Sequence, residues 1–137
     1  MKLALLSDIH ANAEALEVIF ASLNFSGIDA LIIAGDLVGY YFEPKTVLHL
    51  IKSFQKPIYL VRGNHEEMLL RARSYPGELE KITAKYGPGI QVALDQLTES
   101  EINWLTKLPH PLEINKFGLS ILLCHGSPSA VDQYIYP

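Results

Sequence analysis

Residues 30–36 read ALIIAGD, a short apolar run followed directly by a glycine and a carboxylate. Apolar runs of about four to eight residues bounded by turn residues are typical of buried strands. Three more runs of this kind occur in the chain, at residues 3–6, 57–61 and 119–124. We therefore predict four buried strands, each of which ends at a polar loop.

Two amphipathic segments separate the first three predicted strands. In residues 12–23, apolar side chains recur on one face at helical spacing, and residues 44–54 repeat this pattern after a proline suited to a first helical turn. The first three strand ends lie about thirty residues apart, which is the length of a βαβ unit. The pattern predicts parallel strands joined by right-handed crossovers.

The segment between residues 66 and 119 is less regular. Clusters of glycine, proline and other turn residues predict loops at 74–77 and 86–89. An apolar pattern predicts a helix over residues 90–97.

A capping box marks the next predicted helix. Thr98 has the position of the cap and Glu101 follows three residues later, so we expect a helix that continues until a proline ends it. Beyond it, the alternation at 112–114 and the apolar run at 119–124 predict a β-hairpin with its turn at 115–118.

Length and composition limit the classes of protein that this chain can be. With 137 residues, of which 49% are hydrophobic, we expect a single domain over residues 1–137. The formal net charge of −4 argues against a nucleic-acid partner, because a phosphate backbone is bound by an excess of basic residues. Cys124 is the single cysteine, so no intrachain disulfide can form, and the apolar runs are too short to span a membrane. We expect a soluble, cytoplasmic protein.

Oxygen and nitrogen donors follow every predicted strand. They are Asp8 and His10 after the first strand, Asp36 after the second, Asn64 and His65 after the third, and His125 after the fourth. Parallel strands end at the same edge of a sheet, where loops form the ligand-binding crevice of open α/β folds. We therefore expect these side chains to converge on one site.

The donor types indicate a metal site. Carboxylate, imidazole and amide donors without a thiolate cluster suit Mn, Fe, Zn, Ni or Co, whereas imidazole is a poor ligand for calcium. Two such cations close together attract an anion, polarise a phosphoryl oxygen and lower the pKa of a bound water to give hydroxide at neutral pH. The chemistry that this predicts is hydrolysis of a phosphate ester.

Each donor also has an ordinary structural explanation. Asp36 and Asn64 are residue types common in turns, Asp36 could cap a helix, and His125 could be a satisfied histidine at a strand end. The run Gly-Asn-His-Glu at 63–66 is more specific, since chance would give it less than roughly once in a thousand chains of this length.

Four other polar residues are given structural explanations. His49 and His110 have no candidate partners nearby in the sequence, and we expect neither to take part in the site. Arg62 could reach a phosphate, but we expect it to be solvated. Cys124 is expected to be a buried, inert thiol turned away from the site.

The order Asp-x-His, Gly-Asp, Gly-Asn-His-Glu and His-Gly resembles the calcineurin-like metallophosphoesterase superfamily over essentially the whole chain. Residues 7–12, 35–40 and 125–128 are most similar to its small phosphodiesterase-like branch. The resemblance implies an α/β/β/α sandwich with a dinuclear metal centre at the strand ends.

The resemblance also implies a role for each donor. Asp8 and His10 would bind one metal, Asp36 would bridge both, and Asn64 and His125 would bind the other. His65 matches the catalytic histidine of the family, which interacts with the phosphoryl group and can protonate the leaving oxygen.

The chain departs from the family pattern in several places. Ala11 and Tyr41 stand where glycine is frequent, and Glu66 replaces an aspartate. The Asp-Arg-Gly continuation of protein Ser/Thr phosphatases is absent after Gly35-Asp36, which disfavours that branch.

The larger departure is that the Gly-His-x-His motif, which gives each metal a further histidine, does not occur before Pro137. We therefore expect three protein ligands per metal, a second sheet that is incomplete at its C-terminal side, and an exposed edge through which the chain could form a homo-oligomer.

The sequence favours a metal-dependent phosphoesterase that hydrolyses a phosphodiester or phosphomonoester of a small phosphorylated substrate. Two divalent ions would activate the hydroxide, with manganese the expected ion in vitro. The alternative is a truncated, catalytically weak metal- or phosphate-binding module that acts as an interaction or regulatory protein. A third interpretation is a fragment of a longer gene product. Substrate specificity is expected to lie in loops such as residues 75–89.

Overall fold

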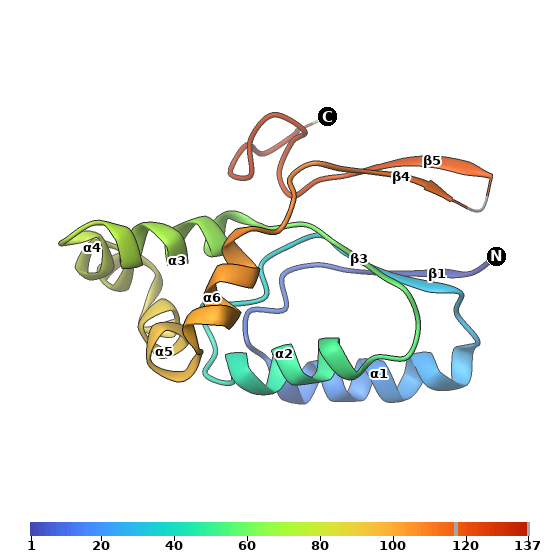
Figure 1. The fold of residues 1–137 in the computed structure, drawn as a ribbon, viewed down its shortest axis with the longest axis horizontal. Coiled ribbons are helices and arrows are strands. Elements are labelled where there is room, and N and C mark those ends of the chain that lie inside the picture. Colours follow the sequence, from blue (N-terminus) through green and yellow to red (C-terminus); the bar gives the residue numbers. More distant parts are fainter. Residues whose placement is uncertain (117, 137) are drawn as a thin grey trace.

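A three-stranded parallel sheet forms the centre of the fold in the computed structural model, which describes residues 1–116 and 118–136 and, for residues 24–26, the backbone alone (Figure 1). Its strands are β1 (Leu3–Leu6), β2 (Ala30–Ile33) and β3 (Ile58–Leu60), in the order β1-β2-β3. The alternation of strands and helices along the first half of the chain is therefore confirmed.

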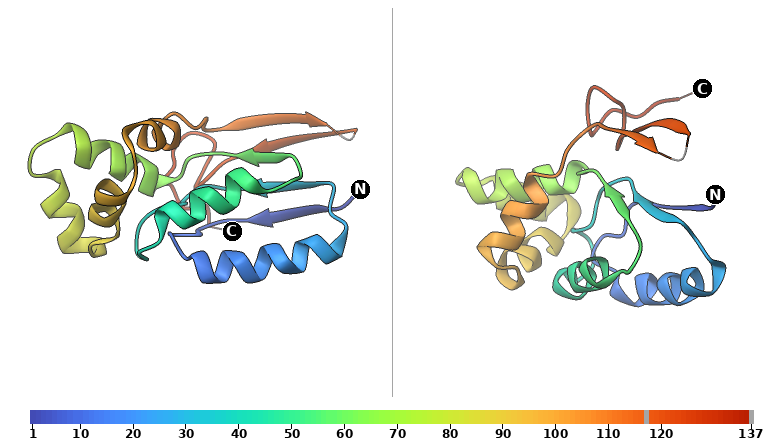
Figure 2. Two further views of the ribbon diagram at one scale, coloured as in Figure 1. Left: turned by 60° about the horizontal axis from the view of Figure 1, so that its bottom comes forward. Right: turned by 45° about the vertical axis from the view of Figure 1, so that its right-hand side comes forward.

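Helices α1 (Ala13–Ser26) and α2 (Pro44–Ser53) cover one face of this sheet (Figures 1 and 2). The Asn12 side chain caps α1 by accepting a hydrogen bond from the Ala15 N–H at 3.1 Å, and Gly27 ends the helix in the left-handed conformation. Both helices begin within one residue of the boundary that the sequence predicts.

A β-hairpin of β4 (Leu112–Lys116) and β5 (Leu119–Leu123) packs on the other face of the sheet. The contact is a small apolar cluster in which Ile32 and Val61 meet Ile114 and Leu123. The layers therefore run helix, sheet, sheet, which confirms the predicted fold class. Part of the predicted turn, Phe117, lies outside the described residues.

Four further helices follow β3 at one end of the sheet: α3 (Asn64–Ser74), α4 (Glu78–Tyr86), α5 (Gly89–Gln96) and α6 (Glu99–Thr106). The capping box at Thr98 and Glu101 is confirmed, with the Glu101 N–H donating to Thr98 Oγ1 at 3.3 Å. Helices α3 and α4 are not predicted from the sequence. Their apolar pattern is sparse, since Ile82 is the only buried residue of α4.

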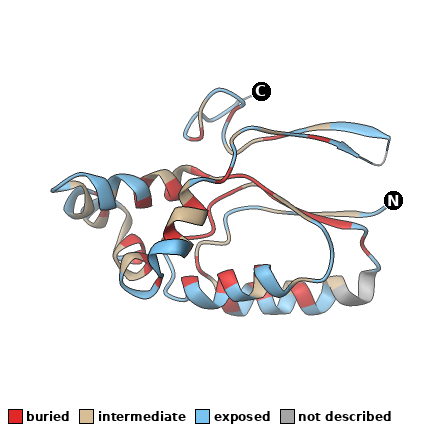
Figure 3. Cartoon of the chain, viewed as in Figure 1, coloured by how far each residue is buried: buried red, intermediate tan, exposed pale blue. Residues whose placement is uncertain are grey.

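The prediction that all four strands are buried is wrong, because only β2 is buried along its whole length (Figure 3). Leu5 of β1 is 68% exposed, and Leu119 and Leu122 of β5 are about half exposed. These side chains are exposed because of where their strands lie. Strand β1 is at the edge of its sheet, and the second sheet has two strands in the described residues, so both of its strands are edge strands. Among those residues, no helix is long and apolar enough to cross a membrane.

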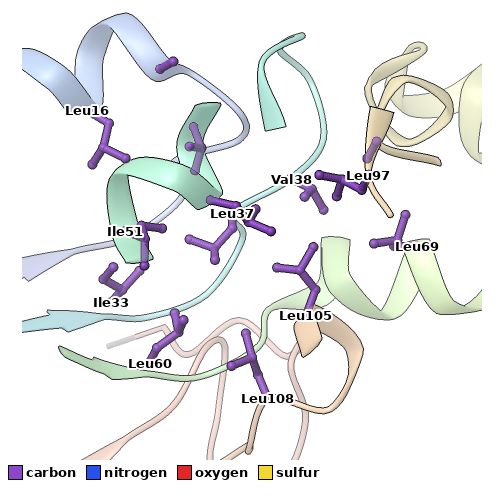
Figure 4. Packing of buried hydrophobic residues seen from close by; sticks show 14 of the residues in the cluster. Leu16, Ile33, Leu37, Val38, Ile51, Leu60, Leu69, Leu97, Leu105 and Leu108 are labelled. Carbon is purple, nitrogen blue, oxygen red and sulfur yellow. The ribbon is translucent and has the colours of Figure 1, made fainter. Parts of the chain in front are cut away.

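The loop after β2 is part of the main core. Leu37 and Val38 are fully buried, and Figure 4 shows them among side chains from the flanking helices, including Leu16, Leu69 and Leu105. A loop anchored in this way offers a rigid base for the carboxylate of Asp36.

Candidate metal centre

The loops that follow β1, β2, β3 and β5 meet at one cleft of about 790 Å³. All six donors predicted from the sequence line it: Asp8, His10, Asp36, Asn64, His65 and His125. The convergence expected from parallel strands is therefore present, and it includes a donor from the antiparallel hairpin.

Asp36 lies at the centre of the donor cluster. Its Oδ2 is 3.7 Å from His10 Nε2 and 3.5 Å from His125 Nε2. Asp8 Oδ1 is 3.6 Å from the same nitrogen of His10, and Asn64 Oδ1 is 2.9 Å from Nε2 of His125. One carboxylate thus stands between two groups of donors, which is the position that a ligand shared by two cations requires.

The backbone orients both histidines. The Nδ1 atom of His10 lies 3.0 Å from the Val38 carbonyl oxygen, and Nδ1 of His125 lies 2.6 Å from the Ala34 carbonyl oxygen. A proton on Nδ1 leaves Nε2 free to bind a metal, and such outer contacts are a general feature of metal-binding histidines. The donor set therefore fits a pair of divalent cations.

Ligand atoms of two overlapping groups each lie within 4.8 Å of one another. One group is Asp8, Asp36 and His125, and the other is His10, Asp36 and His65. His65, for which the family resemblance implies a catalytic role, is therefore close enough to the donors to act on a group that they bind.

The backbone is strained at three of the donors. Asp8, His10 and Asp36 have φ values of 56°, 50° and 56°, in the left-handed region that residues with a side chain rarely adopt. Each such residue costs of order 1–3 kcal/mol and persists where its surroundings hold it. Ala11 also has a positive φ, of 59°, which explains physically why glycine would suit that position.

Glu66 fixes the loop that carries Asp36. Its buried carboxylate accepts hydrogen bonds from the N–H groups of Asp36 at 3.0 Å, Leu37 at 2.8 Å and Val38 at 3.3 Å. It also accepts one from Gly63 at 2.7 Å, at the start of α3. Burial raises the pKa of Glu66, and the Asp36 carboxylate acts in the same direction, while the N–H groups of Gly63, Leu37 and Asp36 oppose both.

The imidazole of His65 lies in a closely fitting slot. It is 2% exposed, and among the described residues its Nδ1 has no hydrogen-bond partner. Its ring packs edge to face with those of His10 and Tyr86, at centroid distances of 4.6 and 5.7 Å. Gly39 forms one wall, because a Cβ there would collide with the imidazole.

Burial moves the pKa values of two site residues in opposite directions. The pKa of His65 is lowered to about 4, mainly by burial and in addition by the neighbouring His10 and His125. Burial raises the pKa of Asp36 to about 6, although the His65 N–H donates to its Oδ1 at 2.9 Å and favours the charged form. A cation beside Asp36 would favour the carboxylate and offset this cost.

His110 supports the site, contrary to the expectation that it takes no part in it. Its Nε2 lies 2.7 Å from the carbonyl oxygen and 3.1 Å from the backbone nitrogen of His125. His49 is exposed on α2, as expected. Arg62 is held by the Leu108 carbonyl oxygen at 2.9 Å and by Glu67 at 3.3 Å, so the prediction of a solvated side chain is wrong.

One wall of the cleft comes from helices that are not predicted from the sequence. Arg71 of α3 and Lys85 and Tyr86 of α4 line it, together with Tyr40 from the loop after β2. A pattern of apolar residues cannot identify such a wall, because these side chains are polar or aromatic and lie partly at the surface.

Two curated proteins resemble the chain over most of its length. An uncharacterised protein of Methanocaldococcus jannaschii is 29% identical over 138 residues, which cover 98% of this chain and 54% of that protein. The symmetrical bis(5'-nucleosyl)-tetraphosphatase of Sodalis glossinidius is 33% identical over 112 residues, or 80% of this chain and 38% of that enzyme. The chain thus spans about half the length, or less, of these relatives.

The fold has a counterpart among solved structures. The crystal structure of a hypothetical protein from Pyrococcus horikoshii matches 98% of this chain and 59% of its own length, with a TM-score of 0.78 and 23% identity. The family model described as calcineurin-like phosphoesterase matches residues 1–136. With the donors gathered at the strand ends, this match establishes that the chain belongs to the calcineurin-like phosphoesterase family.

Proposed function

We propose that this phosphoesterase hydrolyses an ester of a small phosphorylated substrate with the help of two divalent cations bound in the cleft. The observation that carries the proposal is the position of Asp36 Oδ2, 3.7 Å from Nε2 of His10 and 3.5 Å from Nε2 of His125. Membership of the family supports the reaction class.

The donors divide into two sets that share one carboxylate. Asp8, His10 and Asp36 would hold one cation, and Asp36, Asn64 and His125 would hold the other. When bound, such a pair supplies a hydroxide nucleophile at neutral pH and neutralises charge on the phosphoryl oxygens. Manganese is the cation that we propose for assays.

His65 is the residue that we assign to the leaving group. Its lowered pKa keeps the imidazole neutral at neutral pH, so it carries one proton that it can donate in a hydrogen bond to a phosphoryl or leaving oxygen. An anion bound beside the ring would raise that pKa and favour the protonated form. The packing of the ring against His10 and Tyr86 holds it in place for this step.

Two variants separate metal binding from chemistry. With bis(p-nitrophenyl) phosphate and Mn²⁺, we expect Asp36→Ala to lose both metal and turnover, and His65→Ala to keep its metal while turnover falls about a hundredfold or more. His49→Ala, on the exposed face of α2, is the control.

Full turnover in both site variants, or turnover without metal, would contradict the proposal. Metal bound by the wild-type chain without any turnover would instead favour a metal- or phosphate-binding module.

A further inference from the structure

The cleft extends well beyond the donor cluster. At about 790 Å³ it falls within the range of sites that hold whole small molecules, and it continues from the donors to a wall made by α3 and α4. Met68, Arg71, Lys85 and Tyr86 form this wall. A substrate bound through its scissile phosphate at the donors would therefore place the rest of its structure against these side chains.

The wall is positively charged although the chain is acidic overall. The carboxylate of Glu78 is shared by two cations, Arg71 and Lys81, with Lys81 Nζ 2.8 Å from Oε1. Within residues 1–116 and 118–136, no carboxylate oxygen lies within 4.0 Å of the Lys85 ammonium. Neither Glu78 nor Lys81 lines the cleft, so the charged groups of this wall are Arg71, which is paired with Glu78, and Lys85, whose ammonium contacts the Tyr86 side chain.

The Lys85 side chain is exposed, and one aromatic ring connects its ammonium to the donor cluster. Its Nζ lies 4.8 Å from the centroid of the Tyr86 ring, and that ring lies 5.7 Å from the ring of His65. Tyr40 supports Tyr86 at a centroid distance of 6.5 Å. A cation over an aromatic face is attracted by the ring, so the ammonium is held at the cleft.

The acidic residues of the cleft do not cancel this charge. Glu67 lines the cleft but is paired with Arg62 at 3.3 Å. Asp132 belongs to the segment after β5 and is exposed. The remaining carboxylates are Asp8 and Asp36 of the donor cluster.

We propose that Lys85, assisted by Arg71, binds a second phosphoryl group of the substrate, so that the preferred substrates are polyphosphate esters rather than esters of a single phosphate. The inference rests on the proposed function, because it assumes that the scissile phosphate binds at the donor cluster. Lysine binds phosphate as a compact point charge, and a second phosphoryl group adds the negative charge that such a site recognises.

The test compares one substrate that carries additional phosphoryl groups with one that lacks them. For Lys85→Gln we expect kcat/KM for diadenosine tetraphosphate to fall about tenfold, mainly through KM, and kcat/KM for bis(p-nitrophenyl) phosphate to fall much less. Lys81→Gln is the matched control, because Lys81 lies on the same helix and does not line the cleft. Equal effects of Lys85→Gln on both substrates, or no effect on either, would overturn the inference.

A binding measurement keeps this inference separate from the proposed reaction. Calorimetric titration of Mn²⁺-treated protein with the β,γ-methylene analogue of ATP, and with AMP, needs no turnover. Binding of free Mn²⁺ by the nucleotide contributes equally to the titrations of the wild type and the variant, so it cancels when their affinities are compared. We expect Lys85→Gln to weaken binding of the triphosphate analogue about tenfold and binding of AMP much less. If neither substrate is hydrolysed but Lys85→Gln still weakens binding of the triphosphate analogue, the second phosphoryl site is supported while the proposed reaction is wrong. Equal binding of the triphosphate analogue by the wild type and Lys85→Gln would overturn the second phosphoryl site.

Discussion

The side chain of Glu66 holds the backbone of Asp36: Oε2 of Glu66 accepts hydrogen bonds from the N–H of Asp36 at 3.0 Å and from the N–H of Gly63 at 2.7 Å. The same carboxylate therefore joins the loop after β2 to the start of α3. A residue that is not itself an expected metal ligand thus sets the spacing between Asp36 and Asn64.

Removing the Glu66 carboxylate should destabilise the protein. Glu66→Ala leaves buried N–H groups without acceptors, and hydrogen bonds to charged groups contribute about 1.5–3 kcal/mol each. We expect the free energy of unfolding to fall by about 3 kcal/mol or more in urea denaturation. Glu67→Ala is the control, since its partly exposed ion pair with Arg62 should contribute less than about 1 kcal/mol. Similar losses in the two variants would refute this role for Glu66.

The metal-free protein should become more stable when Asp36 loses its charge. Folding raises the pKa of Asp36 from 3.8 to about 6, so the folded protein favours the protonated carboxyl group. The stability that Asp36 contributes is therefore fully present below pH 3.8 and is lost as the pH rises through about 6. In EDTA, Asp36→Asn should therefore raise the free energy of unfolding by about 3 kcal/mol at pH 8 and by about half as much at pH 5. A variant less stable than wild type at pH 8 would show that burial does not penalise this carboxylate.

Filling the space beside His65 should reduce turnover without loss of metal. Gly39 has a φ of 90°, and a Cβ there would lie 2.9 Å from Cε1 of His65. We expect Gly39→Ala to lower kcat about a hundredfold because the imidazole is displaced. Gly77→Ala separates the steric effect from backbone strain, since Gly77 has a φ of 81° and open space around it. Equal loss of kcat in both variants would assign the effect to strain.

His110 should support metal binding through His125. His110→Ala removes the contact of its Nε2 with the His125 backbone, and loss of such supporting groups typically lowers metal affinity about tenfold or more. Titration with Mn²⁺ measures this, with His49→Ala as the histidine control on the surface. Unchanged Mn²⁺ affinity in His110→Ala would mean that other contacts suffice to hold His125.

The parts predictable from the sequence are those that depend on neighbouring residues. The apolar runs and the capping box at Thr98 predict elements that the structure confirms. The convergence of the donors could also be predicted, because parallel strands end at one edge. These inferences use local patterns and one general rule of topology.

The parts that were missed depend on contacts between distant residues. Glu66 acts on backbone N–H groups about thirty residues away, and His110 acts on the backbone of His125, so no pattern of side chains reveals either contact. The exposure of Leu5 follows from the place of β1 at a sheet edge, which an apolar run does not encode. Helices α3 and α4 bury few apolar side chains and so lack the periodicity that identifies a helix.

Helix α3 carries residues of both ends of the cleft, with Asn64 at its first position and Arg71 in its last turn. An α-helix rises 1.5 Å per residue, so these two positions are about 10 Å apart along the helix axis, and the helix keeps the distance between them constant. If Arg71 helps to bind a second phosphoryl group, as proposed above, α3 would set the distance between the two negative charges that a preferred substrate carries. Shortening or lengthening α3 by a full turn would reset that length.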